Sequence, residues 1–327
     1  MARVRWGVLG TANIGVGKVI PAMQTADHVE VVAIASRDLA RARSVADRLG
    51  IPAAYGGYAE LLADANVDAV YIPLPNHLHV EWSINALQAG KHVLCEKPIA
   101  LSVSGAEQLQ AAGRQHPRLK LMEAFMYRHH PQWVRAKELV DSGEIGTLKT
   151  VQAFFSYDNR DPRDIRNQAD IGGGGLMDIG CYPISVARFL FESEPTRIAA
   201  TIEFDAEFGT DTYGNVAMEF ASGSAGFSYS TQLEPYQRVN ILGTKGRVEV
   251  MIPFNAPADR PCVLRVAHGG DERIVELPTT DQYAVQGELM SLAILNDTPV
   301  PTPFEDAVAN MRVIERCFAA ARSGRWE

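Results

Sequence analysis

The sequence predicts an α/β chain of two domains: a doubly wound parallel sheet, followed by an α+β half with a largely antiparallel sheet. Two observations predict this. The first third alternates short apolar runs with helix-like periodicity, whereas most of the chain after Phe125 consists of consecutive strand-like runs joined by turns. A length of 327 residues also exceeds what one core usually supports, and 46% hydrophobic residues can fill two cores.

The first third carries strand and helix signals in regular succession. The predicted strands are Val4–Leu9, Val29–Ala35, Ala69–Pro73, His92–Cys95 and Leu119–Ala124. One intervening helix has Asp38 in position to cap its start and Gly50 where it stops. Another is expected to begin with a capping box of Ser104 and Glu107. Strand, helix and strand in succession indicate a doubly wound sheet.

Strand signals dominate the second part of the chain. A helix at Gln132–Ser142 comes first, and another, Met177–Phe191, follows four consecutive glycines. The last helix is expected at Phe304–Arg322. The predicted strands are Leu148–Tyr157, Arg197–Glu203, Tyr213–Phe220, Ser224–Thr231, Arg238–Leu242, Arg247–Met251, Val263–Val266 and Arg273–Leu277.

Composition excludes several classes of protein. A net charge of −8 without any basic run argues against nucleic-acid binding. The four cysteines show no CxxC spacing, which argues against a zinc cage or a disulfide framework and fits a reducing compartment. No apolar run approaches the roughly 20 residues that cross a bilayer, and no signal peptide is visible. The expectation is a cytoplasmic protein without membrane contact.

A glycine-rich turn follows the first strand. Gly10-Thr11-Ala12-Asn13-Ile14-Gly15 is a GxGxxG pattern in which Ala12 replaces the middle glycine. Small residues let the backbone approach a pyrophosphate, which then lies on the amides of the next helix. The alternative is an ordinary tight turn between a strand and a helix. The position of the motif at the start of a βαβ unit favours dinucleotide binding.

The residues after the second strand bear on the choice of dinucleotide. Ser36 and Arg37 stand where the fold meets the adenosine ribose, and a hydroxyl with a guanidinium suits the extra phosphate of NADP. We therefore expect NADP. In the alternative, Ser36 caps the helix, Arg37 is solvated and Asp38 binds the ribose of NAD.

Five motifs in order resemble those of the Gfo/Idh/MocA oxidoreductases, and within them the NADP-dependent sugar dehydrogenases of xylose or glucose type and the dihydrodiol dehydrogenases. The motifs are Gly7–Gly15, Pro75–His79, Glu96–Pro98, Glu123–Pro131 and Gly172–Tyr182. The resemblance implies a Rossmann domain at 1–124 and a substrate-binding and oligomerisation domain with an open-faced sheet at 125–327. The final helix, 304–322, could pack back on the first domain. A reactive site between the domains is implied.

Lys97 is the first predicted catalytic residue. It follows a parallel strand at its carboxyl end, where α/β folds present ligands. Partial burial and the positive ring of an oxidised nicotinamide would both lower the pKa of the lysine, so that it exchanges protons near neutral pH. The alternative is a surface lysine paired with Glu96.

Asp178 and Tyr182 complete the predicted catalytic set. They are four residues apart in a helix pattern and so project from one face. The tyrosine resembles that of the glucose-fructose oxidoreductase branch, and Lys97 could stabilise its anion. In the alternative, Tyr182 is a core residue and Asp178 an ordinary helix residue. The neighbouring glycines, 172–175, let the backbone pass close to the nicotinamide or the substrate, or form a hinge.

The resemblance and the fold together yield a longer set of site residues. The expected cofactor-binding residues are Gly10, Thr11, Ala12, Asn13, Ile14, Ser36, Arg37, Arg41, Pro75, Asn76, His79, Glu96 and Lys97. The expected substrate-binding residues are Arg128, Tyr157, Arg160 and Arg163. A metal site at His77-x-His79 is disfavoured because no further ligands show suitable spacing.

The implied activity is hydride transfer between nicotinamide and a carbinol carbon of a sugar or polyol, with oxidation of an aldose at C1 as the leading interpretation. Dihydrodiol oxidation, keto-sugar reduction and a non-catalytic NADP or sugar sensor stay open. The resemblance also implies a homodimer or homotetramer through the second sheet. Val216, Met218 and Phe220 are expected on its exposed face, which a partner subunit would cover.

Overall fold

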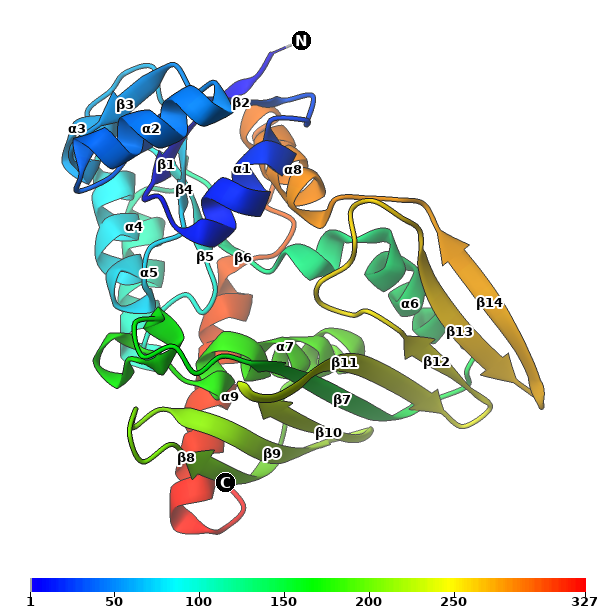
Figure 1. The fold of residues 1–327 in the computed structure, drawn as a ribbon. Helices are drawn as coiled ribbons and strands as arrows, with labels where there is room; N and C mark the ends of the chain where they lie inside the picture. The colour runs from blue at the N-terminus through cyan, green and yellow to red at the C-terminus, as the bar shows by residue number, and fades with distance from the viewer. Residues whose placement is uncertain (1) are drawn as a thin grey trace. The chain divides into compact units, whose positions relative to one another are not determined.

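The computed structural model describes residues 2–327, which form two compact units (Figure 1). The first unit comprises the chain up to Met126 together with Asp281–Val308, and the second comprises Tyr127–Thr280 and Ala309–Glu327. Each unit is therefore built from two separate segments of the chain, whereas the predicted domains, 1–124 and 125–327, are contiguous. That domain assignment stays a proposal.

The first unit contains a six-stranded sheet in the order β3-β2-β1-β4-β5-β6, with every neighbouring pair parallel. The order reverses between β1 and β4, as in a doubly wound sheet, which confirms the predicted fold class. The strands are β1 (Val4–Leu9), β2 (Val29–Ala35), β3 (Ala53–Tyr55), β4 (Ala69–Ile72), β5 (His92–Glu96) and β6 (Leu121–Ala124).

The helical segments of the first unit are η1 (Gly15–Val19), α1 (Ile20–Met23), α2 (Leu39–Leu49), α3 (Tyr58–Leu62), η2 (Asn76–Leu78), α4 (His79–Gln88), α5 (Val103–Gln115) and α8 (Gln282–Leu295). As predicted, Asp38 caps α2 and Gly50 ends it, at φ 67°. The predicted capping box at Ser104 is wrong. Ser102 is the N-cap of α5, and its hydroxyl accepts a hydrogen bond from the Gly105 amide at 3.2 Å.

Helix α8 was not predicted, yet it completes the core of the first unit. It lies beside α1 and contacts β1 and β2 (Figure 1). The Trp6 indole Nε1 donates to Ser291 Oγ at 3.0 Å in the buried core, and the His28 amide donates to Glu288 Oε2 at 2.9 Å. These bonds explain why residues so late in the chain belong to the first unit.

The second unit contains an eight-stranded sheet in the order β14-β13-β12-β11-β7-β10-β9-β8. Only the pair β7 and β10 is parallel among these strands, so the sheet is largely antiparallel, as predicted. The strands are β7 (Leu148–Asp158), β8 (Arg197–Phe204), β9 (Asp211–Phe220), β10 (Gly223–Ser230), β11 (Gln232–Gly243), β12 (Gly246–Val250), β13 (Cys262–His268) and β14 (Asp271–Leu277).

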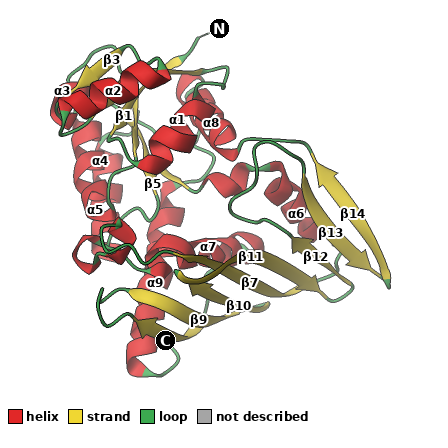
Figure 2. Cartoon of the chain, in the orientation of Figure 1, coloured by secondary structure: helices red, strands yellow, loops and turns green. Residues whose placement is uncertain are grey.

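Helices cover one face of this sheet (Figure 2). Val216, Met218 and Phe220 are buried on that face, so the prediction that they are exposed is wrong. Strand alternation places Asn215 and Ala217 on the other face instead. The helical segments are η3 (Met126–His129), α6 (Pro131–Asp141), η4 (Ile165–Asn167), η5 (Ala169–Ile171), η6 (Leu176–Gly180), α7 (Cys181–Phe191) and α9 (Phe304–Ser323), of which α9 begins within the first unit.

Two further features of residues 2–327 bear on the predicted class. No helix among these residues is long and apolar enough to span a membrane. Within the same range, no group of three or more His, Cys, Asp or Glu residues could hold a metal ion. The four cysteines are buried, and none of them forms a disulfide within these residues.

Candidate active site

The turn after β1 has the backbone that a dinucleotide site requires. Gly10 adopts φ +115°, which other residues rarely adopt, and its amide donates to the Ala35 carbonyl at 2.9 Å. A Cβ on Gly10 would lie 3.0 Å from Leu74 Cδ2. A Cβ on Gly15 would lie 3.3 Å from Pro73 Cγ, so this glycine lets the following helical segment pack closely on the sheet. The turn therefore fits the pyrophosphate of a dinucleotide.

An arginine from α2 contacts the main chain of this turn. The Arg41 guanidinium donates from Nη2 to the Thr11 carbonyl at 3.1 Å. Thr11 is buried, Ala12 and Ile14 are half-buried, and Asn13 is exposed. Arg41 was among the predicted cofactor residues, and it lies against this turn.

At the end of β2, some side chains already form hydrogen bonds with the main chain. The Asp38 carboxylate accepts hydrogen bonds from the amides of Ala40 at 2.9 Å and Arg41 at 3.2 Å, and so caps α2. Ser36 is buried and its hydroxyl accepts from the Asp38 amide at 3.3 Å. The Arg37 side chain is exposed. Asp38 thus serves the helix, while Arg37 faces solvent.

Lys97 follows β5 at its carboxyl end and is half-buried. Its amide donates to Glu96 Oε2 at 3.3 Å, and the Tyr71 hydroxyl donates to Glu96 Oε1 at 2.7 Å. Burial, and next the Glu96 charge, raise the pKa of Tyr71, so this phenol stays protonated. Glu96 therefore fixes the backbone from which the Lys97 side chain extends.

His79 joins the loops that follow β4 and β5. Its ring is buried, with Nδ1 2.8 Å from the Pro98 carbonyl and Nε2 2.7 Å from the Leu74 carbonyl. Burial lowers the pKa of His79 to about 4, so the ring is neutral at neutral pH and donates to one of the two carbonyls. Pro75 and Asn76, at the start of η2, lie on the loop that His79 anchors. The ring serves the backbone and is not placed as a metal ligand.

The glycine-rich segment before η6 is packed against the second unit itself. A Cβ on Gly174, at φ +117°, would overlap Asp211 Oδ1. A Cβ on Gly175 would lie 2.7 Å from Tyr229 Cε2, and one on Gly173 would lie 2.6 Å from the Arg166 carbonyl. These glycines closely approach two strands and a loop of the chain itself, and their predicted approach to the nicotinamide or the substrate stays a prediction.

Asp211 is the buried anchor of that segment. Its Oδ2 accepts from the Tyr229 hydroxyl and from the Leu176 amide, each at 2.6 Å. Burial raises the pKa of Asp211, which the two hydrogen bonds oppose. The carboxylate thereby fixes the first residue of η6, the helical turn that carries Asp178.

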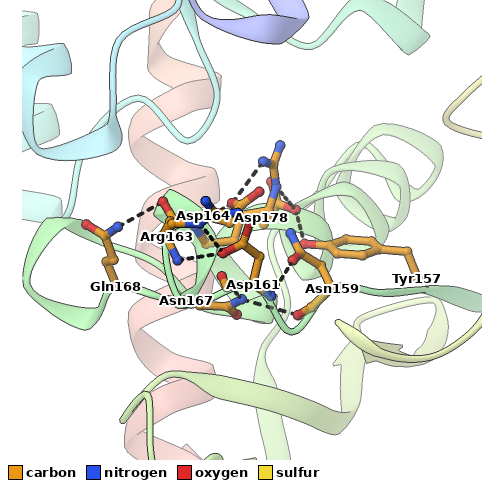
Figure 3. A network of polar contacts seen from close by, with 9 residues as sticks. Tyr157, Asn159, Asp161, Arg163, Asp164, Asn167, Gln168 and Asp178 are labelled. Carbon is orange, nitrogen blue, oxygen red and sulfur yellow. Dashed lines mark hydrogen bonds and ion pairs between the residues drawn. The ribbon is translucent and has the colours of Figure 1, made fainter.

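Asp178 lies at the centre of a polar network (Figure 3). Its Oδ2 accepts from the Tyr157 hydroxyl at 2.7 Å and from Arg166 Nε at 2.9 Å. Asp164 in turn accepts from Arg166 Nη1 at 3.3 Å. Burial, and next the Asp178 charge, raise the pKa of Tyr157, so the phenol remains a donor. Tyr157 was predicted as a substrate-binding residue, and in this unit it contacts Asp178.

Tyr182 lies one turn after Asp178, in α7, and is only 6% exposed. Its ring centroid is 5.1 Å from Phe254, 5.7 Å from Tyr127 and 5.8 Å from Phe155. This aromatic cluster fixes the orientation of the phenol ring.

Arg128 is engaged within the second unit. Its Nη2 donates to Ser185 Oγ at 2.8 Å and its Nε to the same atom at 3.1 Å, and the guanidinium lies 5.5 Å from the Phe189 ring centroid. The predicted substrate-binding role for Arg128 must therefore accommodate a guanidinium that already holds α7.

Three Asp-x-Arg pairs follow one another after β7: Asp158 with Arg160, Asp161 with Arg163, and Asp164 with Arg166. In each, the aspartate binds the arginine two residues later. The Arg160 side chain is 61% exposed and that of Arg163 87%, and neither is brought to Asp178. Arg166, at 38%, reaches Asp178 as well. The sequence prediction missed Arg166, although the threefold repeat was a signal that could have singled out this segment.

Comparison with known proteins places these sites in a family. Residues 4–125 match the model of the GFO/IDH/MocA oxidoreductase family with an NAD-binding Rossmann fold, and residues 133–249 match the GFO/IDH/MocA C-terminal domain. A D-xylose 1-dehydrogenase (NADP⁺) from Haloferax volcanii is 42% identical over 329 residues, covering 98% of each chain. The chain is a Gfo/Idh/MocA oxidoreductase. The predicted family and enzyme class are confirmed.

Solved structures of other family members have the same fold. A 3-ketoreductase from Actinomadura kijaniata in complex with NADP and TDP-benzene is 33% identical, with a TM-score of 0.91 over 97% of this chain and 98% of that one. An aldose-aldose oxidoreductase from Caulobacter crescentus, complexed with glycerol, is 27% identical, with a TM-score of 0.92 over 99% of both chains. This oxidoreductase is thus similar to family members over nearly its whole length.

Proposed function

We propose that this oxidoreductase uses NADP to oxidise a free aldose at C1 to the lactone. The observation that carries the proposal is the Asp178 carboxylate, held by Tyr157 and Arg166 one turn before Tyr182 in a chain of this family. A carboxylate and a phenol on successive turns can bind a sugar hydroxyl and remove its proton. The similarity to a xylose dehydrogenase supports the same activity.

Three side chains divide the chemistry. The Lys97 ammonium stabilises the phenolate form of Tyr182, and this phenolate accepts the proton of the C1 hydroxyl and becomes a neutral phenol. Asp178 accepts a hydrogen bond from the sugar and orients it. Bound NADP supplies the acceptor for the hydride that leaves C1. The substrate thus loses one hydride and one proton in forming the lactone.

The proposal of NADP is supported by the end of β2. The Asp38 carboxylate caps α2. It is therefore already bound at the position where an NAD-specific enzyme uses a carboxylate to bind the adenosine ribose. Arg37 is exposed and suits the extra phosphate, with Ser36 and Arg41 beside it along the chain. The turn Gly10–Ile14 is proposed to hold the pyrophosphate, and the loop of Pro75 and Asn76, which the buried His79 ring anchors, is proposed to lie at the nicotinamide ribose. The xylose dehydrogenase and the 3-ketoreductase are both named with NADP.

The charge of the loop after β7 favours a free sugar over a nucleotide-linked one. Arg160, Arg163 and Arg166 each bind the aspartate two residues earlier. The loop therefore offers no excess of positive charge for a diphosphate, while its polar groups can still bind sugar hydroxyls.

Two other activities within the family stay as alternatives, because relatives bear their names. These are reduction of a dTDP-linked keto-sugar, as in the 33% identical reductase from Actinomadura kijaniata, and oxidation of a trans-dihydrodiol, as in a 30% identical dehydrogenase from Xenopus tropicalis. A protein that senses NADP or sugar without turnover is a third alternative from another class.

The second sheet is proposed to form a homodimer or homotetramer. Its uncovered face presents small and polar side chains such as Asn215, Ala217 and Ser228. These side chains permit another sheet to pack closely on this face. A partner subunit there would also prevent the unspecific association that exposed strands promote.

The proposal is tested by incubating the full chain with NADP and a panel of aldoses while recording absorbance at the wavelength of reduced nicotinamide. We expect turnover with at least one aldose, and with NADP preferred to NAD. Turnover with a dihydrodiol alone, or oxidation of NADPH by a dTDP-keto-sugar alone, would replace the proposal by one of the alternatives. Tight NADP binding without turnover of any substrate would indicate a sensor.

A further inference from the structure

The three Asp-x-Arg pairs after β7 differ in one respect. The guanidinium of Arg163 binds Asp161, and that of Arg160 binds Asp158. The third arginine, Arg166, bridges two carboxylates from different parts of the second unit. The repeat therefore contains two exposed local pairs and one pair that extends to the proposed site.

The bridge is partly buried. The Asp178 side chain is 15% exposed and that of Arg166 38%. Arg166 donates from Nε to Asp178 at 2.9 Å and from Nη1 to Asp164 at 3.3 Å, and the Arg166 amide donates to the same Asp164 oxygen at 2.9 Å. An ion pair that is shielded in this way is screened less by water than the two exposed pairs.

The backbone holds this arginine in place independently of its side chain. The Arg166 carbonyl accepts from the Gly174 amide at 2.8 Å, and the Gln168 carbonyl accepts from the Gly173 amide at 2.9 Å. The glycine segment that leads into Asp178 thus runs against the loop that carries Arg166. Any side chain at Gly173 would push the two apart.

We propose that Arg166 is a positioning residue for Asp178: its guanidinium keeps the carboxylate ionised and turned in one direction, and Asp164 fixes the guanidinium. This inference rests on the proposed function and deepens it. It states that Asp178 is ionised when it orients the sugar for oxidation. The charged or titratable groups that face Asp178 within the second unit include Tyr157 from β7 and Arg166, with Asp164 behind it.

The direct test measures the titration of Asp178 without any substrate. In the full chain labelled with ¹³C at aspartate carboxyl carbons, with Asp178→Asn identifying the resonance, Arg166→Gln should raise the titration midpoint of Asp178 by about one pH unit or more. The reason is that a nearby cation favours the ionised carboxylate. Arg166→Lys retains a cation and should show a smaller rise. An unchanged midpoint in Arg166→Gln would overturn the proposal.

Kinetics provides the second readout. With an aldose that the wild-type chain oxidises, Arg166→Gln should lower kcat about 10- to 100-fold, leave the dissociation constant of NADP unchanged, and move the acidic limb of the kcat/KM profile to higher pH. Arg166→Lys should recover part of kcat. Arg135→Gln is the matched control: Arg135 is also 38% exposed and pairs with Glu138 on α6, and this variant should behave as the wild type.

The outcomes separate this inference from the proposed function. Absence of sugar turnover by the wild-type chain refutes the proposed function, while the NMR titration still tests the effect of Arg166 on Asp178. Turnover with an unchanged pH profile in Arg166→Gln refutes the positioning role alone. If Arg166→Gln does not fold, Asp164→Asn provides the test through kcat and its pH profile, because without the Asp164 carboxylate the guanidinium is no longer fixed against Asp178. A profile like that of the wild type would then count against the role.

Discussion

The two units hold their proposed catalytic residues in different ways. In the first unit, the loop that leads to Lys97 is fixed by contacts to the main chain: the His79 ring faces the carbonyls of Leu74 and Pro98, and the Ile99 amide donates to Glu123 at 2.8 Å. In the second unit, the Asp178 carboxylate is itself held by two other side chains, those of Tyr157 and Arg166.

The second arrangement depends on two aspartates. Asp211, from β9, fixes the start of η6, and Asp164 fixes the arginine that binds Asp178. Contacts to the main chain tolerate changes in the side chains around them, whereas a chain of carboxylates and donors fails when one member is lost. We therefore expect substitution of Lys97 to affect chemistry alone, and substitutions that disturb Asp211 or Asp164 to affect both chemistry and stability.

The largest expected effect is that of Lys97→Ala. Because the ammonium is proposed to stabilise the phenolate of Tyr182, its loss should lower kcat about 10³-fold or more. The dissociation constant of NADP, measured by fluorescence titration, should change little, and so should the melting temperature. Activity within about tenfold of the wild type would remove Lys97 from the proposed mechanism.

Tyr182→Phe should lower kcat about 10²-fold, because it removes the proton acceptor. The ring would stay among Phe254, Tyr127 and Phe155, so thermal unfolding should resemble that of the wild type. Steady-state kinetics and a melting curve test both expectations. A loss of stability without a loss of kcat would mean that Tyr182 is a core residue only.

Gly174→Ala compared with Gly10→Ala tests the difference between the units directly. Both glycines have positive φ, but a Cβ at Gly174 overlaps the buried Asp211, while one at Gly10 meets the end of the Leu74 side chain at 3.0 Å. Gly174→Ala should cost about 3 kcal/mol or more of stability, and Gly10→Ala about 1–3 kcal/mol.

Melting curves of the two variants measure this order. Gly174→Ala should also lower kcat, whereas Gly10→Ala should mainly weaken NADP. Equal melting temperatures would contradict the proposed dependence of the second unit on Asp211.

The smallest expected effect is that of Arg37→Ala on cofactor choice. Loss of a charge-assisted hydrogen bond to the ribose phosphate should raise KM for NADP about 10- to 100-fold and leave KM for NAD nearly unchanged. Initial rates with each cofactor measure the ratio. Equal losses with both cofactors would refute the assignment of the phosphate to Arg37.

Much of the fold was predictable because its signals are local. Val4–Leu9 and Val29–Ala35 are apolar runs that each contain one charged residue, Arg5 and Glu30, and they form strands with the predicted bounds. The eight strands of the second sheet were also predicted. Strand β3 was missed because three residues, Ala53–Tyr55, carry no periodic signal. Helix α8 was missed because its buried residues include the polar Gln282, Gln286 and Ser291 beside apolar ones, so the sequence shows no distinct apolar face.

The candidate site was predictable where a motif marks it. The family motifs identified Lys97, Asp178 and Tyr182 as hypotheses, and the preference for NADP agrees with the names of the relatives. Arg166 and Asp211 belong to no such motif. Their roles depend on contacts across 12 and 35 residues, respectively, which spacing along the chain does not reveal.

The return of Asp281–Val308 to the first unit sets a limit on how this protein can be divided. The polypeptide passes between the units at Met126, at Thr280 and again at Val308, so no single cut yields two intact halves. A fragment ending near residue 126 would leave the Trp6 indole without Ser291. Chimeras that exchange substrate specificity among relatives would therefore need to transplant Tyr127–Thr280 as an insert and retain the host's own α8.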